Sequence, residues 1–190
     1  MARFVRPLFL AALLSLAACS HSPPREVTIA GNRIDSAKIR MATVVLMPQS
    51  ISFYVPLNES TLRSMGCKFV SDQKKDLDAL ADILASSSIR VAESSEGDFE
   101  PRIGVFLLLD DFVDSMEVRL LTNQDFVDQE NLRGHVSVPR QSNMAATDVP
   151  RAVVPRLHDW ALTAKYVDQG PITRRECESR SAFVRSVQGT

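Results

Sequence analysis

The chain has 190 residues, of which 45% are hydrophobic and 24% are charged, and its formal net charge is −1. This length and composition predict one globular domain with its own core. Binding of nucleic acid or anionic lipid requires clustered Lys and Arg, and so small a net charge gives no indication of such a cluster.

The amino terminus is organised like an export signal. Arg3 and Arg6 precede an apolar run at 8–14, and the sequence Leu-Ala-Ala-Cys follows at 16–19. A secretory signal needs a positive start, about 7 to 15 apolar residues and small residues at the cleavage site, whereas a spanning helix needs about 20 apolar residues. The apolar run is too short to span, so residues 1–18 are predicted to be a cleaved signal peptide.

The same segment resembles the signal peptide and lipobox of bacterial lipoproteins, over residues 1–19 only. The resemblance implies that Cys19 is lipidated and becomes the first residue of the mature protein. Ser20, rather than Asp, implies sorting to the outer membrane on the side facing the periplasm. The acyl chains on Cys19 would then hold the protein at the membrane, and a stable anchor requires several such chains. The alternative is an ordinary cleaved signal with Cys19 unmodified.

If Cys19 carries lipid, Cys67 and Cys177 are the remaining cysteines. An even pair in an exported protein is typical of a disulfide. The bridge would close a loop of about 110 residues, for which the chain-entropy model gives up to about 4.7 kcal/mol. The alternative, Cys67 as a nucleophile paired with a histidine, has no support in the neighbouring sequence.

Residues 19–26 are predicted to be a tether, because Pro23 and Pro24 favour an extended conformation. Residues 27–190 are predicted to form the single domain. Apolar runs and period-two alternation predict strands at 39–47, 51–55, 89–92, 103–109, 116–121 and 134–138. The strands at 89–92 and 103–109 are predicted to pair as a hairpin, because a turn signal with Gly97 lies between them.

Apolar spacings of three and four residues predict helices over 72–86, from 148–155 to 167, and from 174 to about 187. Thr173 and Glu176 match a capping box at the start of the last helix, which would carry Cys177 inward. We therefore expect an α+β fold, with an antiparallel sheet of about five strands and two or three helices packed on one face.

Asp110, Asp111 and Asp114 form a DDxxD pattern. It resembles the motif of prenyl-diphosphate enzymes, in which carboxylates one helical turn apart hold magnesium. Those enzymes are large and all-helical, so a solvated turn is the favoured interpretation. The tetrapeptide at 111–114 recurs at 125–128, and two copies fit successive strand and turn units better than a repeat array. A calcium site would need about six to eight oxygen ligands and a loop that neither copy provides.

His21, His135 and His158 lack the ligand spacing of a zinc site, and the chain has no serine-nucleophile motif. We expect no metal and no cofactor. The favoured hypothesis is a lipid-anchored envelope protein with a non-catalytic binding or assembly domain. The second is a periplasmic inhibitor or immunity-type protein that captures a basic partner. The third is a small metal-dependent hydrolase using the acids at 110–114 with His135 or His158.

Overall fold

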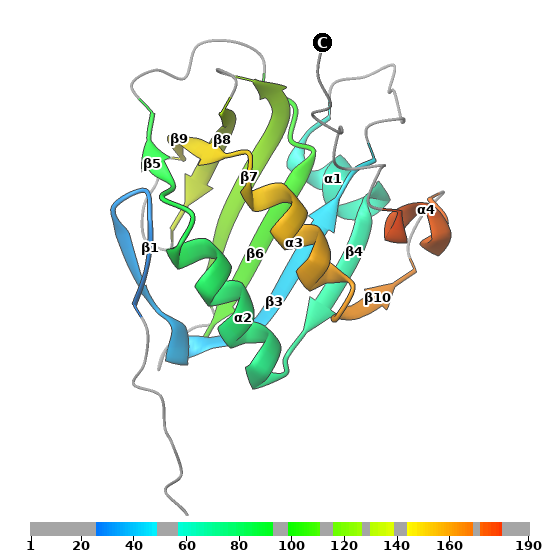
Figure 1. The fold of residues 1–190 in the computed structure, drawn as a ribbon, viewed down its shortest axis with the longest axis horizontal. Helices are drawn as coiled ribbons and strands as arrows, with labels where there is room; N and C mark the ends of the chain where they lie inside the picture. Colours follow the sequence, from blue (N-terminus) through cyan, green and yellow to red (C-terminus); the bar gives the residue numbers. More distant parts are fainter. Residues whose placement is uncertain are drawn as a thin grey trace, which may run out of the picture.

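The computed structural model describes residues 26–48, 57–92, 99–110, 116–126, 130–138, 144–168 and 172–179. These residues form an α+β fold, as predicted. In Figure 1, two helices cross one large sheet, and a two-stranded hairpin lies near one of its edges.

An eight-stranded antiparallel sheet forms the centre of the molecule, in the order β10-β4-β3-β6-β7-β8-β9-β5. Its strands are β3 (Ile39–Leu46), β4 (Cys67–Ser71), β5 (Arg90–Val91), β6 (Ile103–Leu109), β7 (Met116–Phe126), β8 (Asn131–Ser137), β9 (Ala145–Pro150) and β10 (Lys165–Val167). The hairpin consists of β1 (Glu26–Ile29) and β2 (Asn32–Asp35), and the 3-10 helix η1 (Ser36–Lys38) follows it. The sheet has more than the expected five strands. Strands β4, β9 and β10 are short and mixed in composition, so no apolar run in the sequence marks them.

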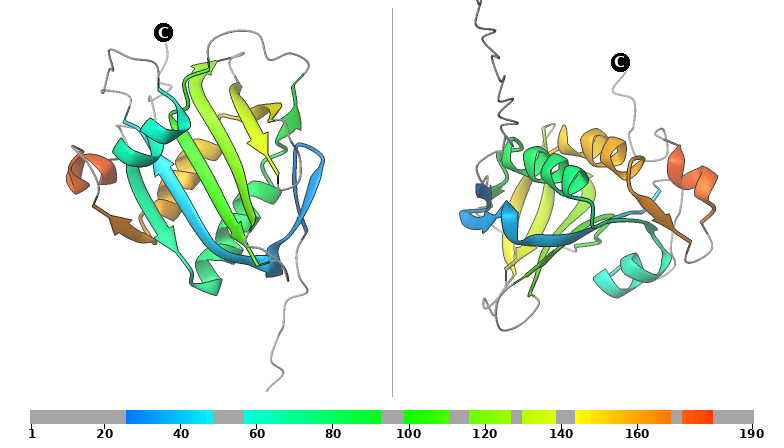
Figure 2. Two further views of the ribbon diagram at one scale, coloured as in Figure 1. Left: turned by 180° about the vertical axis from the view of Figure 1, so that it is seen from behind. Right: turned by 90° about the horizontal axis from the view of Figure 1, so that it is seen from below.

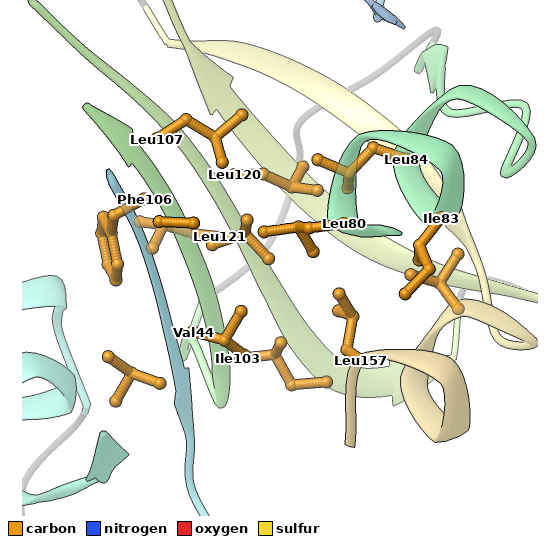
Figure 3. Close-up of a cluster of buried hydrophobic side chains, with 14 of the residues drawn as sticks. Val44, Leu80, Ile83, Leu84, Ile103, Phe106, Leu107, Leu120, Leu121 and Leu157 are labelled. Atoms are coloured by element: carbon orange, nitrogen blue, oxygen red, sulfur yellow. The ribbon is translucent and has the colours of Figure 1, made fainter. Parts of the chain in front are cut away.

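The helices are α1 (Glu59–Met65), α2 (Lys74–Ala85), α3 (Val153–Ala161) and α4 (Arg174–Glu178). Helices α2 and α3 lie side by side on one face of the sheet, which we call the inner face (Figures 1 and 2). Leu80 and Leu84 of α2 and Leu157 of α3 are at most 2% exposed and project toward the strands (Figure 3). Because full burial of one leucine contributes about 1.5–3 kcal/mol, this layer supplies much of the driving force for folding.

Helix α2 confirms the prediction over 72–86, with its ends shifted by one or two residues. The Ser71 hydroxyl donates a 2.7 Å hydrogen bond to the Asp76 carboxylate near the start of α2. The indole Nε1 of Trp160 donates a 2.7 Å bond to the backbone oxygen of Asp76. That buried bond fixes α3 against α2.

Helix α1 packs on the opposite face of the sheet, which we call the outer face (Figure 2). The Asn58 side chain caps it by accepting a 2.9 Å bond from the backbone N–H of Thr61, and Leu62 is its buried residue. The predicted packing of two helices on one face is confirmed by α2 and α3, and α1 is an additional helix that the sequence analysis did not predict. The outer face also carries apolar side chains, Val45 and Phe106, and they need a cover.

The predicted hairpin between 89–92 and 103–109 is wrong. Strand β5 pairs with β9, and β6 lies between β3 and β7, so both edges of β6 are already occupied. The second predicted helix is also too long, because α3 ends at Ala161 and 165–167 forms β10. Pairing with β4 satisfies the backbone groups of β10, a tertiary effect that the apolar spacing does not reveal.

Two further predictions fall wholly or partly outside the described residues. The strand expected at 51–55 lies there, as does the end of the helix expected to reach 187. The start of that helix is confirmed, since α4 begins at Arg174.

Candidate functional site

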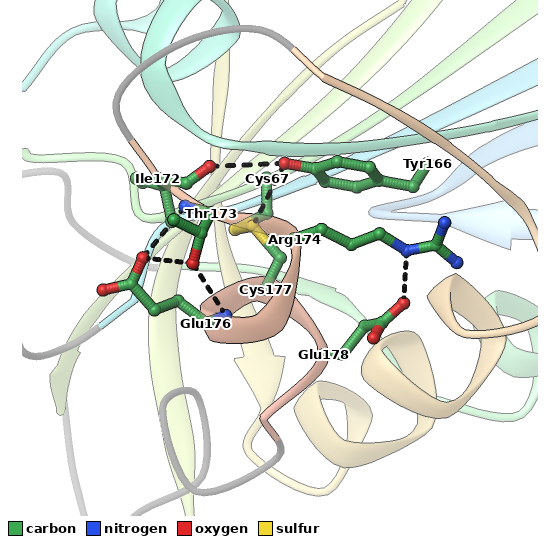
Figure 4. Close-up of a disulfide and its surroundings, with 8 residues drawn as sticks. All are labelled: Cys67, Tyr166, Ile172, Thr173, Arg174, Glu176, Cys177 and Glu178. Carbon is green, nitrogen blue, oxygen red and sulfur yellow. Dashed lines mark hydrogen bonds and ion pairs between the residues drawn. A yellow bond between two sulfur atoms is a disulfide. The ribbon is translucent and has the colours of Figure 1, made fainter.

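The two cysteines predicted to pair are joined by a disulfide (Figure 4). Cys67 is the first residue of β4 and Cys177 lies in α4, with their Cα atoms 5.5 Å apart. Both side chains are buried, and the bridge spans 110 residues of sequence. It fixes α4 to the sheet, and it rules out Cys67 as a nucleophile because a bonded sulfur carries no thiolate.

Hydrogen bonds around the disulfide define the start of α4. The Thr173 hydroxyl accepts a bond from the backbone N–H of Glu176, and the Glu176 carboxylate accepts one from the backbone N–H of Thr173 at 2.9 Å. Hydrogen bonds from the Thr173 side chain and backbone lower the pKa of Glu176. The Tyr166 hydroxyl donates to the backbone oxygen of Ile172 at 3.3 Å (Figure 4). These contacts make the segment a structural clamp.

Asp110, the one acid of the DDxxD motif that the structure describes, lies away from both histidines. Asp110 is exposed at the end of β6, while Asp111 and Asp114 lie outside the described residues. His158 is buried in α3, on the inner face of the sheet. Among the residues that the structure describes, no cluster of three His, Cys, Asp or Glu side chains could hold a metal ion.

His135 lies on the other side of the sheet from His158. It is opposite Leu121 of β7, which is opposite Gly104 of β6. Gly104 faces α1, because a Cβ added to it would lie 3.2 Å from Leu62. Asp110 follows Gly104 by six residues, about 20 Å along a strand. Asp110 and His135 therefore do not meet, and the other two acids of the motif lie outside the described residues.

Strand register identifies the remaining outer-face residues. Phe106 shares this face with Gly104, since side chains alternate along a strand, and it is opposite Arg119 of β7. Arg119 is in turn opposite Ser137 of β8. The same alternation assigns to the outer face Glu117, Arg119, Arg133, His135, Ser137, Ala146, Asp148 and Arg90.

Arg63 of α1 organises the centre of this face. Its guanidinium lies 3.6 Å from the centroid of the Phe106 ring, donates to the Glu117 carboxylate at 2.6 and 3.2 Å, and donates to Glu59 at 2.9 Å. Burial alone would lower the pKa of Arg63, but Glu117 and Glu59 outweigh that effect and raise it. Arg63 and Glu117 are each 36% exposed, so solvent limits their ion pair to about 0.2–1 kcal/mol.

Arg119 is less completely paired than Arg63. Its terminal nitrogens lie 3.3 Å from the Glu59 carboxylate and 3.4 Å from the Ser137 hydroxyl. Its Nε is buried and has no hydrogen-bond partner among the described residues. Since Arg63 and Arg119 share Glu59, the Arg119 guanidinium retains donor capacity.

His135 stacks on Phe99, with ring centroids 4.0 Å apart and an interplanar angle of 38°. Burial lowers the pKa of His135, and the charge of Arg133 lowers it further. The imidazole is therefore neutral near pH 7.

A row of charges crosses the far end of the outer face. Arg133 of β8 is opposite Asp148 of β9, which is opposite Arg90 of β5. Within the described part of the chain, no salt bridge joins either arginine to Asp148. We call the outer face of β5, β7, β8 and β9 the open region, because the described helices reach it only where the Arg63 and Glu59 side chains of α1 contact β7 (Figure 2).

Apart from His135, the sequence did not single out the residues of the open region. Arg63 and Glu117 are 54 residues apart, and Arg90 and Arg133 meet only through β9. A signal was present in β8, where Arg133, His135 and Ser137 alternate with apolar residues and so define one polar face.

None of the described helices combines the length and apolar composition needed to cross a bilayer. No protein-family description, no curated protein and no solved structure matches this chain at a significant level.

Proposed function

We propose that this protein is a lipid-anchored component of the bacterial cell envelope whose domain binds another envelope component through the open region, without catalysis. The anchor is Cys19, attached to the outer membrane and followed by a short tether into β1. The observation that carries the binding function is the asymmetry of the sheet. Helices α2 and α3 bury the inner face, while the open region presents the partly exposed side chains of Arg133 and His135 and the exposed side chain of Arg90.

Three features support this assignment. The Leu-Ala-Ala-Cys sequence at 16–19 resembles a lipobox. The buried disulfide is of the kind that persists in an oxidising compartment such as the periplasm. An exposed polar sheet face held rigid by a covered inner face is suited to presenting side chains to a partner.

The anchor is tested by Cys19→Ala. We expect the variant to leave the membrane fraction or to accumulate as unprocessed precursor, whereas Cys19→Ala protein that fractionates like the parent would contradict the anchor. The matched control is Ser22→Ala, three residues further along the tether, which should fractionate normally.

The binding surface is tested by site-specific photo-crosslinking in intact membranes. A photoreactive residue at Ala146, on the outer face of β9, should give a discrete crosslinked product. The same residue at Leu162, which is 50% exposed beyond the end of α3, serves as the control and should not. A product from Leu162 but not Ala146 would refute the assignment to the open region. Protection against a co-expressed periplasmic hydrolase would instead favour the inhibitor function.

A further inference from the structure

We infer that the segment recognised by the open region is an acidic, extended peptide with two carboxylates about four residues apart. This inference rests on the proposed binding function and adds the chemistry of the partner. It depends on three arginines, Arg90, Arg119 and Arg133, which we call the arginine patch.

The sheet fixes the spacing of the arginine patch. Arg119 is opposite Ser137, and Ser137 follows Arg133 by four residues in β8, about 13 Å at about 3.3 Å per residue. Arg90 lies two strands away from Arg133, about 10 Å across the sheet. An extended peptide along β8 would therefore meet Arg119 and Arg133 with side chains four residues apart.

The arginine patch has more donors than its neighbours accept. Among the described residues, Arg119 makes long contacts to Glu59 and Ser137, and Glu59 is shared with Arg63. Arg90 and Arg133 flank the single carboxylate of Asp148. Among the described residues of this face, guanidinium groups therefore outnumber carboxylates, and the neutral His135 between Arg119 and Arg133 does not change that balance.

Guanidinium groups favour carboxylates because the planar fork matches both oxygens of the acid. A membrane surface is the less suitable occupant, since lipid headgroup binding generally uses clusters of about four to eight Lys or Arg. The arginine patch favours a negatively charged partner, whereas the negative net charge of the whole chain would favour a basic partner. The arginine patch is locally basic on a mildly acidic protein.

The test uses the full chain in detergent and two labelled peptides, one with two Glu residues four positions apart and one with Gln at both positions. We expect the Glu peptide to bind more tightly, and its affinity to fall with added salt. Arg133→Gln should weaken binding of the Glu peptide roughly fivefold, because each exposed charge pair contributes about 1 kcal/mol. The double variant Arg90→Gln with Arg133→Gln should weaken binding further. The control is Arg156→Gln, on α3 at the inner side of the molecule, which should bind normally.

Equal binding of the Glu and Gln peptides would overturn the inference, as would an equal loss in Arg156→Gln. Binding to phosphatidylglycerol vesicles that is lost in the double variant, without discrimination between the peptides, would assign the arginine patch to membrane phosphates instead. Failure of the proposed function is read separately, from the Cys19→Ala fractionation and the crosslinking at Ala146.

Discussion

Gly104 lets the Phe106 ring lie flat beneath Arg63, so Gly104→Ala should destabilise the protein by disturbing that stack. An added Cβ would lie 2.6 and 2.7 Å from two carbons of the Phe106 ring and 3.2 Å from Leu62. Such overpacking costs about 1–3 kcal/mol, while replacing a strand glycine regains about 0.5–1 kcal/mol. We expect a net loss of about 1–2 kcal/mol in the free energy of unfolding.

A double-mutant cycle separates the ring contact from other effects. Phe106→Ala alone should cost about 3–5 kcal/mol, since the ring is 2% exposed. In that background Gly104→Ala should be neutral or mildly stabilising, which gives a coupling of about 1–3 kcal/mol. Urea denaturation followed by the fluorescence of Trp160, the single tryptophan, measures each variant. An equal cost of Gly104→Ala with and without the ring would refute the stacked arrangement.

Three further predictions concern other parts of the molecule. Replacing both Cys67 and Cys177 by Ser should lower the free energy of unfolding by up to about 4.7 kcal/mol, measured by urea denaturation, and a loss below about 1 kcal/mol would show that the loop constraint is unimportant. Burial lowers the pKa of His135, so the fold should lose stability as the pH falls below about 6.5; His135→Gln should show a smaller loss between pH 7.5 and 5.0, and identical pH profiles would contradict this. Trp160→Phe should cost about 1–3 kcal/mol by thermal unfolding, because the backbone oxygen of Asp76 loses its buried donor.

Local signals in the sequence predicted the elements that depend on local physics. The apolar spacing in α2, the apolar run in β6 and the capping box of Thr173 and Glu176 all appear in the structure. The cysteine pairing was predictable from the number of cysteines together with the predicted export signal. These features need no knowledge of how distant segments meet.

The missed features depend on distant segments. Residues 165–167 continue a helical spacing but form β10, because the edge of β4 offers them backbone partners. The open region combines residues from four strands, and register decides which side chains share a face. A shift of one residue would reverse that assignment, so the sequence alone does not define the surface.

The two strands that end the sheet, β5 and β10, are only 2 and 3 residues long. Long flat edge strands offer unpaired backbone groups on which other chains can build fibres. Anchored at a bilayer as proposed, the protein would meet its own copies often, and such short edge strands would give them few backbone groups to pair with. The short edge strands thus favour recognition by side chains over uncontrolled polymerisation.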